Sequence, residues 1–271
     1  MLNVIFSMDR AMQLDSLLRS MEKYYKNYND DKIIIVYKYT NEQYKKGYEK
    51  VMNTYPNYYY FQETDIKQNM LDIFEDNKEQ KYSVFFSDDN LWKDDFDSKT
   101  NVNFQAFEFD EQILCYTLRL HPRIKKCYPM GNIDTPPPKF NDEPYIWNWQ
   151  GLSGDWGYPC SIDGHIFRTG IVHSMIKLLP YKNVNQIEAF MSMQHNILKN
   201  HYPKMVCSNK SAIMNLPWNR VQTNSPNINM DIDLNMLNEK YINGEIIDLD
   251  FYKGFDTISP HQEVEIKFTK E

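Results

Sequence analysis

The sequence lacks the features that mark several large classes of protein. Its four cysteines lie far apart and include no Cys-x-x-Cys pair, so we expect free thiols in a reducing compartment, not a zinc site or a redox pair. It contains no Gly-x-Gly-x-x-Gly motif and no phosphate-binding loop, which disfavours a dinucleotide-dependent enzyme or an NTPase. It also has no extended run of lysine and arginine, so nucleic acid is not an expected partner.

Long apolar stretches are missing as well. Nothing approaches the roughly 20 consecutive apolar residues of a membrane-spanning helix, and the amino terminus does not read as a signal peptide. We therefore expect no membrane span and a cytoplasmic location, while the oligomeric state stays open. Aromatic residues, in contrast, make up 15% of the chain. Their flat faces suit stacking on sugars or bases, although most aromatic side chains pack in cores.

The first 90 residues alternate between two kinds of pattern. Apolar and β-branched runs predict strands at 2–6, 32–39, 58–62 and 82–86. Apolar residues at helical spacing predict helices within 12–21, 41–51 and 67–74. This alternation predicts an α/β fold with a central, mostly parallel sheet flanked by helices, in which ligands bind at the carboxyl ends of the strands.

The second half of the chain is less regular. It predicts a strand within 109–120, a proline-rich loop at 131–144, an amphipathic helix at 185–201 capped by Asn185, and a last strand at 264–268. No internal repeat or long linker divides the chain. We expect one domain over 1–271, with a nucleotide-binding half at 1–100 and an acceptor-binding half at 101–271.

Two adjacent carboxylates, Asp88 and Asp89, end the predicted strand in the segment FFSDDN. Neighbouring carboxylates repel one another unless a cation lies between them. Mn²⁺ or Mg²⁺ prefers oxygen ligands and also binds substrate phosphates, so this pair predicts a divalent metal site. The alternative is a simple turn in which Asp and Asn side chains cap the next segment.

Six segments, in this order, resemble a family of GT-A-type glycosyltransferases found in bacteria and large DNA viruses. They are IFSMDR, IIIVYKYTNEQYKKGYEKV, KQNML, FFSDDN, WNWQGLSGDWGYPCSIDGHIFR and HQEVEIKF, and they extend over nearly the whole chain. The resemblance implies transfer of a sugar from a nucleotide-sugar donor, most often a UDP-sugar, to a carbohydrate acceptor. Guanine or thymine as the base stays open.

The resemblance also implies site residues by position. Those that would contact the donor are Ser7, Met8, Arg10, Tyr37, Lys67, Asn69 and Asp88. Those that would hold the metal ion are Asp89, Asn90 and the late histidine His261. Asn90 is a departure, because the family's motif ends in Asp and an amide oxygen carries less charge.

Three carboxylates are candidate catalytic residues, and two of them, Asp155 and Glu188, are candidates for the general base that deprotonates the acceptor. Asp155 lies between two glycines beside Trp149 and Trp156, which could form an acceptor platform or an aromatic loop that only anchors the proline-rich segment. Asp163 is two residues from His165, so on a strand both would face the same way. Three roles stay open for Asp163 and His165. Each could be catalytic, each could orient a substrate, or the two could form a hydrogen-bonded polar pair in the core.

Glu188 is the third carboxylate, and it falls in the first turn of the predicted 185–201 helix. In related inverting enzymes a carboxylate at such a position is the base. The alternative is that Glu188 only interacts favourably with the positive end of the helix dipole. With a base present, in-line attack with inversion is the economical mechanism. Two other functions stay open: a sugar nucleotidyltransferase, although FSMDRAMQ lacks the expected glycine-rich loop, and a catalytically weak or non-catalytic protein that binds nucleotide sugars or carbohydrate.

Overall fold

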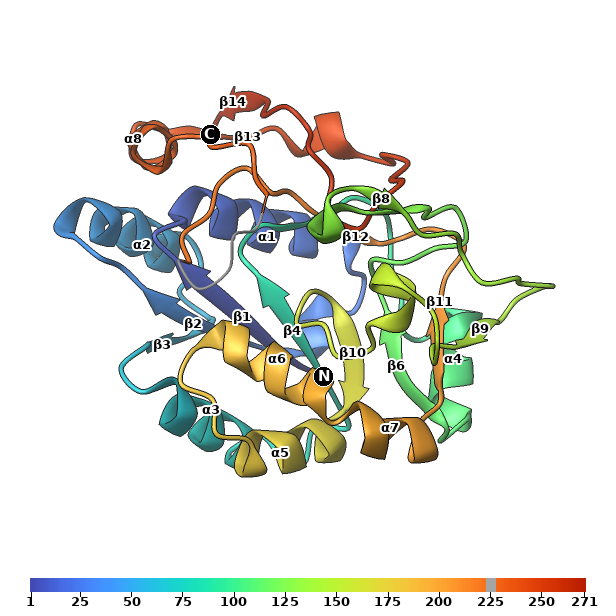
Figure 1. Ribbon diagram of the computed structural model, residues 1–271. Helices are drawn as coiled ribbons and strands as arrows, with labels where there is room; N and C mark the ends of the chain where they lie inside the picture. Colours follow the sequence, from blue (N-terminus) through green and yellow to red (C-terminus); the bar gives the residue numbers. More distant parts are fainter. Residues whose placement is uncertain (223–227) are drawn as a thin grey trace.

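A computed structural model describes residues 1–222 and 228–271 of the protein. Within these residues an eight-stranded sheet forms the centre, in the strand order β3-β2-β1-β4-β10-β6-β11-β9 (Figure 1). Its strands are β1 (Leu2–Met8), β2 (Lys32–Lys38), β3 (Tyr59–Gln62), β4 (Tyr82–Ser87), β6 (Ile113–Thr117), β9 (Tyr145–Asn148), β10 (His165–Arg168) and β11 (Lys204–Cys207). Only β9 and β10 run against the others, so the predicted α/β fold with a mostly parallel sheet is confirmed.

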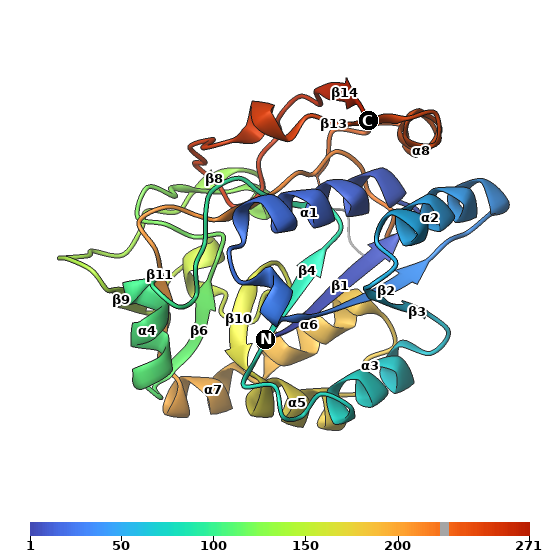
Figure 2. The same ribbon diagram turned by 180° about the vertical axis from the view of Figure 1, so that it is seen from behind.

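Helices cover both faces of the sheet. They are α1 (Ala11–Tyr24), α2 (Glu42–Thr54), α3 (Ile66–Glu75), α4 (Val102–Phe109), α5 (Thr169–Leu178), α6 (Val184–Met193), α7 (His195–His201) and α8 (Leu234–Ile242). One face carries α1 and α2, with α8 beyond them, and the other carries α3, α5, α6 and α7 (Figures 1 and 2). Two apolar cores result, one on each face, which explains why β1 is buried along nearly its whole length.

None of these helices has the length and apolar character needed to cross a bilayer, as far as residues 1–222 and 228–271 show.

Three predicted boundaries are wrong. The helix predicted at 185–201 is two helices, because the chain bends at Gln194 between α6 and α7, and Asn183 rather than Asn185 caps α6 by accepting a hydrogen bond from the Gln186 amide at 3.0 Å. The strand predicted from Phe109 begins only at Ile113, since α4 occupies the preceding residues. The last strand is β14 (Phe268–Lys270), which pairs with β13 (Glu245–Ile247).

Candidate active site

A cavity of about 460 Å³ opens at the carboxyl ends of β1, β2 and β4. The polar and charged side chains from the first half of the chain on its wall are Ser7, Arg10, Lys38, Glu63, Ser87, Asp88 and Asp89. Those from the second half include Asp163, Asn183, Asn185, Glu188, Asn215, Asn219, Arg220 and His261. The predicted location of a ligand site in a parallel sheet is thus where the cavity lies.

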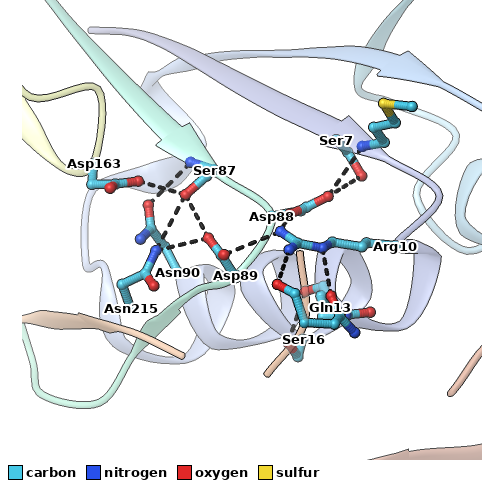
Figure 3. Close-up of polar contacts among 12 residues, drawn as sticks. Ser7, Arg10, Gln13, Ser16, Ser87, Asp88, Asp89, Asn90, Asp163 and Asn215 are labelled. Atoms are coloured by element: carbon cyan, nitrogen blue, oxygen red, sulfur yellow. Dashed lines mark hydrogen bonds and ion pairs between the residues drawn. The ribbon is translucent and has the colours of Figure 1, made fainter. Parts of the chain in front are cut away.

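Arg10 occupies the centre of the first-half wall. Its guanidinium Nη1 donates to Asp88 Oδ1 at 2.9 Å and to Asp89 Oδ2 at 3.1 Å (Figure 3). Nε donates to Asn219 Oδ1 at 2.7 Å, and Nη2 donates to the Asn219 carbonyl oxygen. The side chain is therefore held from both sides and is only 7% exposed.

The loop after β1 positions the Arg10 side chain. Asp9 adopts a left-handed backbone with φ of 57°, a conformation that Asp tolerates better than most residues. Its carboxylate accepts hydrogen bonds from the Thr40 amide at 2.7 Å and the Thr40 hydroxyl at 2.8 Å. The loop is thereby tied to the end of β2. Arg10 is the N-cap residue of α1, and its side chain reaches Asp88 and Asp89, which follow β4.

Asp88 and Asp89 also have hydrogen-bond donors on their other oxygens. Asp88 Oδ2 accepts from Ser7 Oγ at 2.9 Å and from the Met8 amide at 3.2 Å. Asp89 Oδ1 lies 2.6 Å from Ser87 Oγ and accepts from Asn215 Nδ2 at 2.7 Å. Burial raises the pKa of Asp88 to about 6, although the nearby Arg10 charge opposes the shift.

A second group of carboxylates, Asp163 and Glu188, also lies on the cavity wall. Asp163 Oδ1 lies 2.5 Å from Ser87 Oγ, and Asp163 Oδ2 lies 3.4 Å from His261 Nε2 and 3.9 Å from an Arg119 nitrogen. Burial alone would raise the pKa of Asp163, but the contact with His261 and the charge of Arg119 hold it well below its usual value. Asp163 is therefore a fixed anion.

Glu188 differs from Asp163 in its electrostatics. Burial, followed by repulsion from Asp163, raises the pKa of Glu188 to about 7. It lies on α6 and on the cavity wall, where the Ile162 amide is 3.4 Å from its Oε1. Since α6 begins at Val184, Glu188 belongs to the second turn, so the predicted partnership with the helix dipole in a first turn does not apply. A carboxylate with a pKa near neutrality can exchange a proton with a bound substrate.

The predicted donor-contacting residues divide into two groups. Ser7, Met8, Arg10 and Asp88 lie on the cavity wall. The other three lie off the wall as the structure describes it: Tyr37, Lys67 and Asn69.

Each of the residues off the wall has a structural partner instead. Tyr37 packs against Tyr48 with ring centroids 5.2 Å apart. Lys67 Nζ donates to carbonyl oxygens at the end of α5, including that of Leu179 at 2.9 Å. Asn69 Oδ1 accepts from the Thr64 amide at 3.3 Å.

The predicted acceptor platform does not face the cavity. Trp149 and Trp156 are both 0% exposed and pack in the core on the α3–α5 face. Asp155 is buried as well and forms an ion pair with Arg119 at 2.9 Å. None of the three lies on the cavity wall, because the aromatic loop is folded into the interior.

Asp163 and His165 do not act as a pair either. Asp163 precedes β10 and faces the cavity, whereas His165 begins the strand and is 0% exposed. The His165 ring lies 3.2 Å from the Pro159 carbonyl oxygen, and burial lowers its pKa to about 3. His165 is a neutral core residue, and the positive φ of the intervening Gly164 (70°) turns the two apart.

The predicted metal ligands do not converge. Asn90 is 1% exposed, lies off the cavity wall and accepts a hydrogen bond from the Ser87 amide at 3.1 Å. Within residues 1–222 and 228–271, no group of three or more His, Cys, Asp or Glu side chains is arranged to hold a metal ion. The cation between Asp88 and Asp89 is Arg10. The described side chains thus do not fit the Mn²⁺ or Mg²⁺ expected from the sequence.

Several site residues escaped the sequence analysis. Ser87 and Asn215 connect the carboxylates, and Asn219 holds Arg10. Arg119 is 2% exposed and pairs with Asp155. Of these residues, only Arg119 could have been predicted from the sequence, because a charged residue inside the apolar stretch 113–120 requires a buried partner.

The chain is similar in sequence to a known glycosyltransferase. No protein-family model matches the sequence. The chain is 27% identical over 189 residues to the bifunctional glycosyltransferase pgtA of Dictyostelium discoideum, an alignment that takes in 64% of this chain and 24% of pgtA. The chain therefore corresponds to about a quarter of that relative's length.

Solved structures give weaker likenesses. TarS of S. aureus (residues 1–349) matches with a TM-score of 0.49 and 15% identity, over 78% of this chain and 59% of that one. The 4-diphosphocytidyl-2C-methyl-D-erythritol synthase of Anaerococcus prevotii matches with a TM-score of 0.42 and 10% identity, over 89% and 98%. Both scores are too low to support an argument about function.

Proposed function

We propose that this protein is a glycosyltransferase that moves a sugar from a nucleotide-sugar donor to a hydroxyl group of a carbohydrate acceptor. The sequence similarity to pgtA supports the class of enzyme. The observation that carries the proposal is the cavity at the carboxyl ends of β1, β2 and β4, which brings Glu188 and the Arg10–Asp88–Asp89 cluster to one space. A UDP-sugar is the first donor to test, following the GT-A resemblance.

Glu188 is the proposed general base. Asp163 is held as an anion by its neighbours and Asp155 is paired away from the cavity, whereas the pKa of Glu188 is about 7. A base is most effective when its pKa lies near the working pH. Of the three carboxylates predicted from the sequence, Glu188 is therefore the one suited to accept a proton from substrate.

In the proposed reaction, Glu188 takes the proton of the acceptor hydroxyl as its oxygen bonds to the anomeric carbon of the donor sugar. The bond from that carbon to the diphosphate oxygen breaks, and the nucleoside diphosphate leaves with the bonding electrons. Attack opposite to the leaving group inverts the anomeric configuration. No step is assigned to a metal ion, because the described side chains do not gather one.

Glu188→Gln tests the proposal. The amide keeps the shape of the side chain but cannot accept the proton, so we expect transfer to fall about 100-fold or more while donor affinity is retained. The measurement is release of nucleoside diphosphate from a panel of nucleotide sugars with mixed oligosaccharide acceptors. The matched control is Glu239→Gln, an exposed glutamate on α8, which should not change the rate. Equal rates for wild type and Glu188→Gln would contradict the assignment.

A further inference from the structure

We infer that Arg10 is the resident cation of this site, so that donor binding does not require a divalent metal ion. In this proposal the Arg10 guanidinium takes the place of a metal ion beside Asp88 and Asp89. This inference rests on the proposed nucleotide-sugar function and deepens it.

The position of Arg10 is the first observation. Its Nη1 donates to one oxygen of each carboxylate, at 2.9 and 3.1 Å, so it lies where a shared metal ion would otherwise relieve their repulsion (Figure 3). A guanidinium stays protonated at any physiological pH. The repulsion between Asp88 and Asp89 is therefore already offset by the chain itself.

The second observation is that Arg10 is not free to leave. Its Nε and Nη2 donate to the side-chain and main-chain oxygens of Asn219. Displacing the side chain would leave Asn219 and both carboxylates without these donors in a buried environment, which is costly. A metal ion would have to compete against the whole set of contacts.

The third observation concerns the carboxylates themselves. Each of their four oxygens has a hydrogen-bond partner, two oxygens being bound to Arg10 and the others to the residues beside them. These partners are Ser7, Met8, Ser87 and Asn215. The carboxylates thus face protein donors, which agrees with the absence of a converging ligand group among the described residues.

Arginine also provides what a diphosphate needs. The planar guanidinium can donate to phosphate oxygens with the charge retained. Arg10 and Arg220 both line the cavity, and Arg220 follows Asn219 in the sequence. Two arginines therefore contribute positive charge to the cavity wall without a metal ion.

Isothermal titration with UDP as the probe tests this inference. We expect wild type to bind UDP in excess EDTA with an affinity within about twofold of that in Mn²⁺. Arg10→Gln should weaken binding in EDTA about tenfold or more, because a charge-assisted contact is lost. The same variant should regain affinity in Mn²⁺, since its carboxylates are released to bind a metal ion. Arg123→Gln, which removes an exposed guanidinium, is the control.

The possible outcomes distinguish a failure of the role of Arg10 from a failure of the proposed glycosyltransferase function. Binding of UDP to wild type only in Mn²⁺ would overturn the role of Arg10 and leave the proposed function in place, as would unchanged affinity of Arg10→Gln in EDTA. If UDP, GDP, dTDP and CDP all fail to bind in either buffer, the proposed function itself fails. If Arg10→Gln does not fold, the inference is tested instead by the UDP affinity of Arg10→Lys in EDTA and by the UDP affinity of wild type in EDTA and in Mn²⁺.

Discussion

At the scale of single residues, the environment of each carboxylate decides its chemistry. Asp163 and Glu188 lie on the same wall, yet their pKa values move in opposite directions. Asp163 has His261 and Arg119 beside it, and these stabilise its charge. Glu188 is affected mainly by burial and by the charge of Asp163, both of which favour its protonated form.

The pH dependence of activity should follow from Glu188. A base must be deprotonated to act, so with a pKa of about 7 the rate of transfer should rise between pH 6 and 8 and then level off. The measurement is kcat as a function of pH at saturating donor and acceptor. A profile that stays flat through this range would show that another group accepts the proton.

Stability should respond to pH in the opposite direction. The folded-state pKa of Glu188 is about 7 against an ordinary value of 4.5, so the folded protein binds the proton more tightly than the unfolded chain does. The free energy of unfolding should therefore fall as pH rises from about 4.5 to 7, by at most about 3 kcal/mol from this group. Urea unfolding at several pH values compares wild type with Glu188→Gln, in which this part of the slope should vanish.

At the scale of elements, side chains that seemed suited to a ligand instead join one helix to another. Lys67, at the start of α3, donates to the carbonyl oxygens that end α5 and lies with its Nζ 4.6 Å from the centroid of the Tyr181 ring. A cation is favourable at the carboxyl end of a helix because the last carbonyls there lack partners. The residue is thus part of the contact between α3 and α5.

Lys67→Met should separate this structural role from donor binding. We expect a loss of about 1 kcal/mol in the free energy of unfolding, because the α5 carbonyls lose a charged donor, while donor affinity stays unchanged. Chemical denaturation and nucleotide titration provide the two readouts. Lys78→Met, which removes only an exposed pair with Glu75, is the control. A large drop in donor affinity for Lys67→Met would restore the role implied by the family resemblance.

At the scale of the whole molecule, the carboxyl-terminal segment is fastened onto the first helices. Asp15 on α1 is 3% exposed and accepts hydrogen bonds from Tyr55 at 3.2 Å and from Tyr241 on α8 at 3.2 Å. It also pairs with Arg19 at 2.7 Å. One buried carboxylate thereby connects α1, the end of α2 and α8, which are far apart in the sequence.

Removing this connection should weaken the whole fold. Asp15→Ala leaves Arg19 and two tyrosine hydroxyls without their acceptor, so we expect a loss of about 2–4 kcal/mol in the free energy of unfolding. The measurement is chemical denaturation, with Asp30→Ala as the control because its pair with Lys99 is exposed. Unchanged cooperativity and stability in Asp15→Ala would show that α8 is held by its apolar contacts alone.

The sequence by itself determined the strands and helices that depend on local hydrophobic patterns. Runs such as Lys32–Tyr39 alternate with helical patterns, and this periodicity alone predicts the parallel half of the sheet and the edge at which a ligand site lies. The family resemblance adds that Ser7, Arg10, Asp88 and Glu188 belong to a site. All four lie on the cavity wall: Ser7, Arg10 and Asp88 at or just after the ends of β1 and β4, and Glu188 in the second turn of α6.

Only the tertiary structure decided how these side chains are paired. The adjacent carboxylates of Asp88 and Asp89 predicted a cation between them. Their local sequence could not show that this cation is Arg10, which lies in the loop after β1. From the sequence, Trp149 and Trp156 fitted an acceptor platform and an aromatic loop that anchors the proline-rich segment equally well. Their burial depends on packing with elements distant in the sequence, and no pattern within a single segment contains that information.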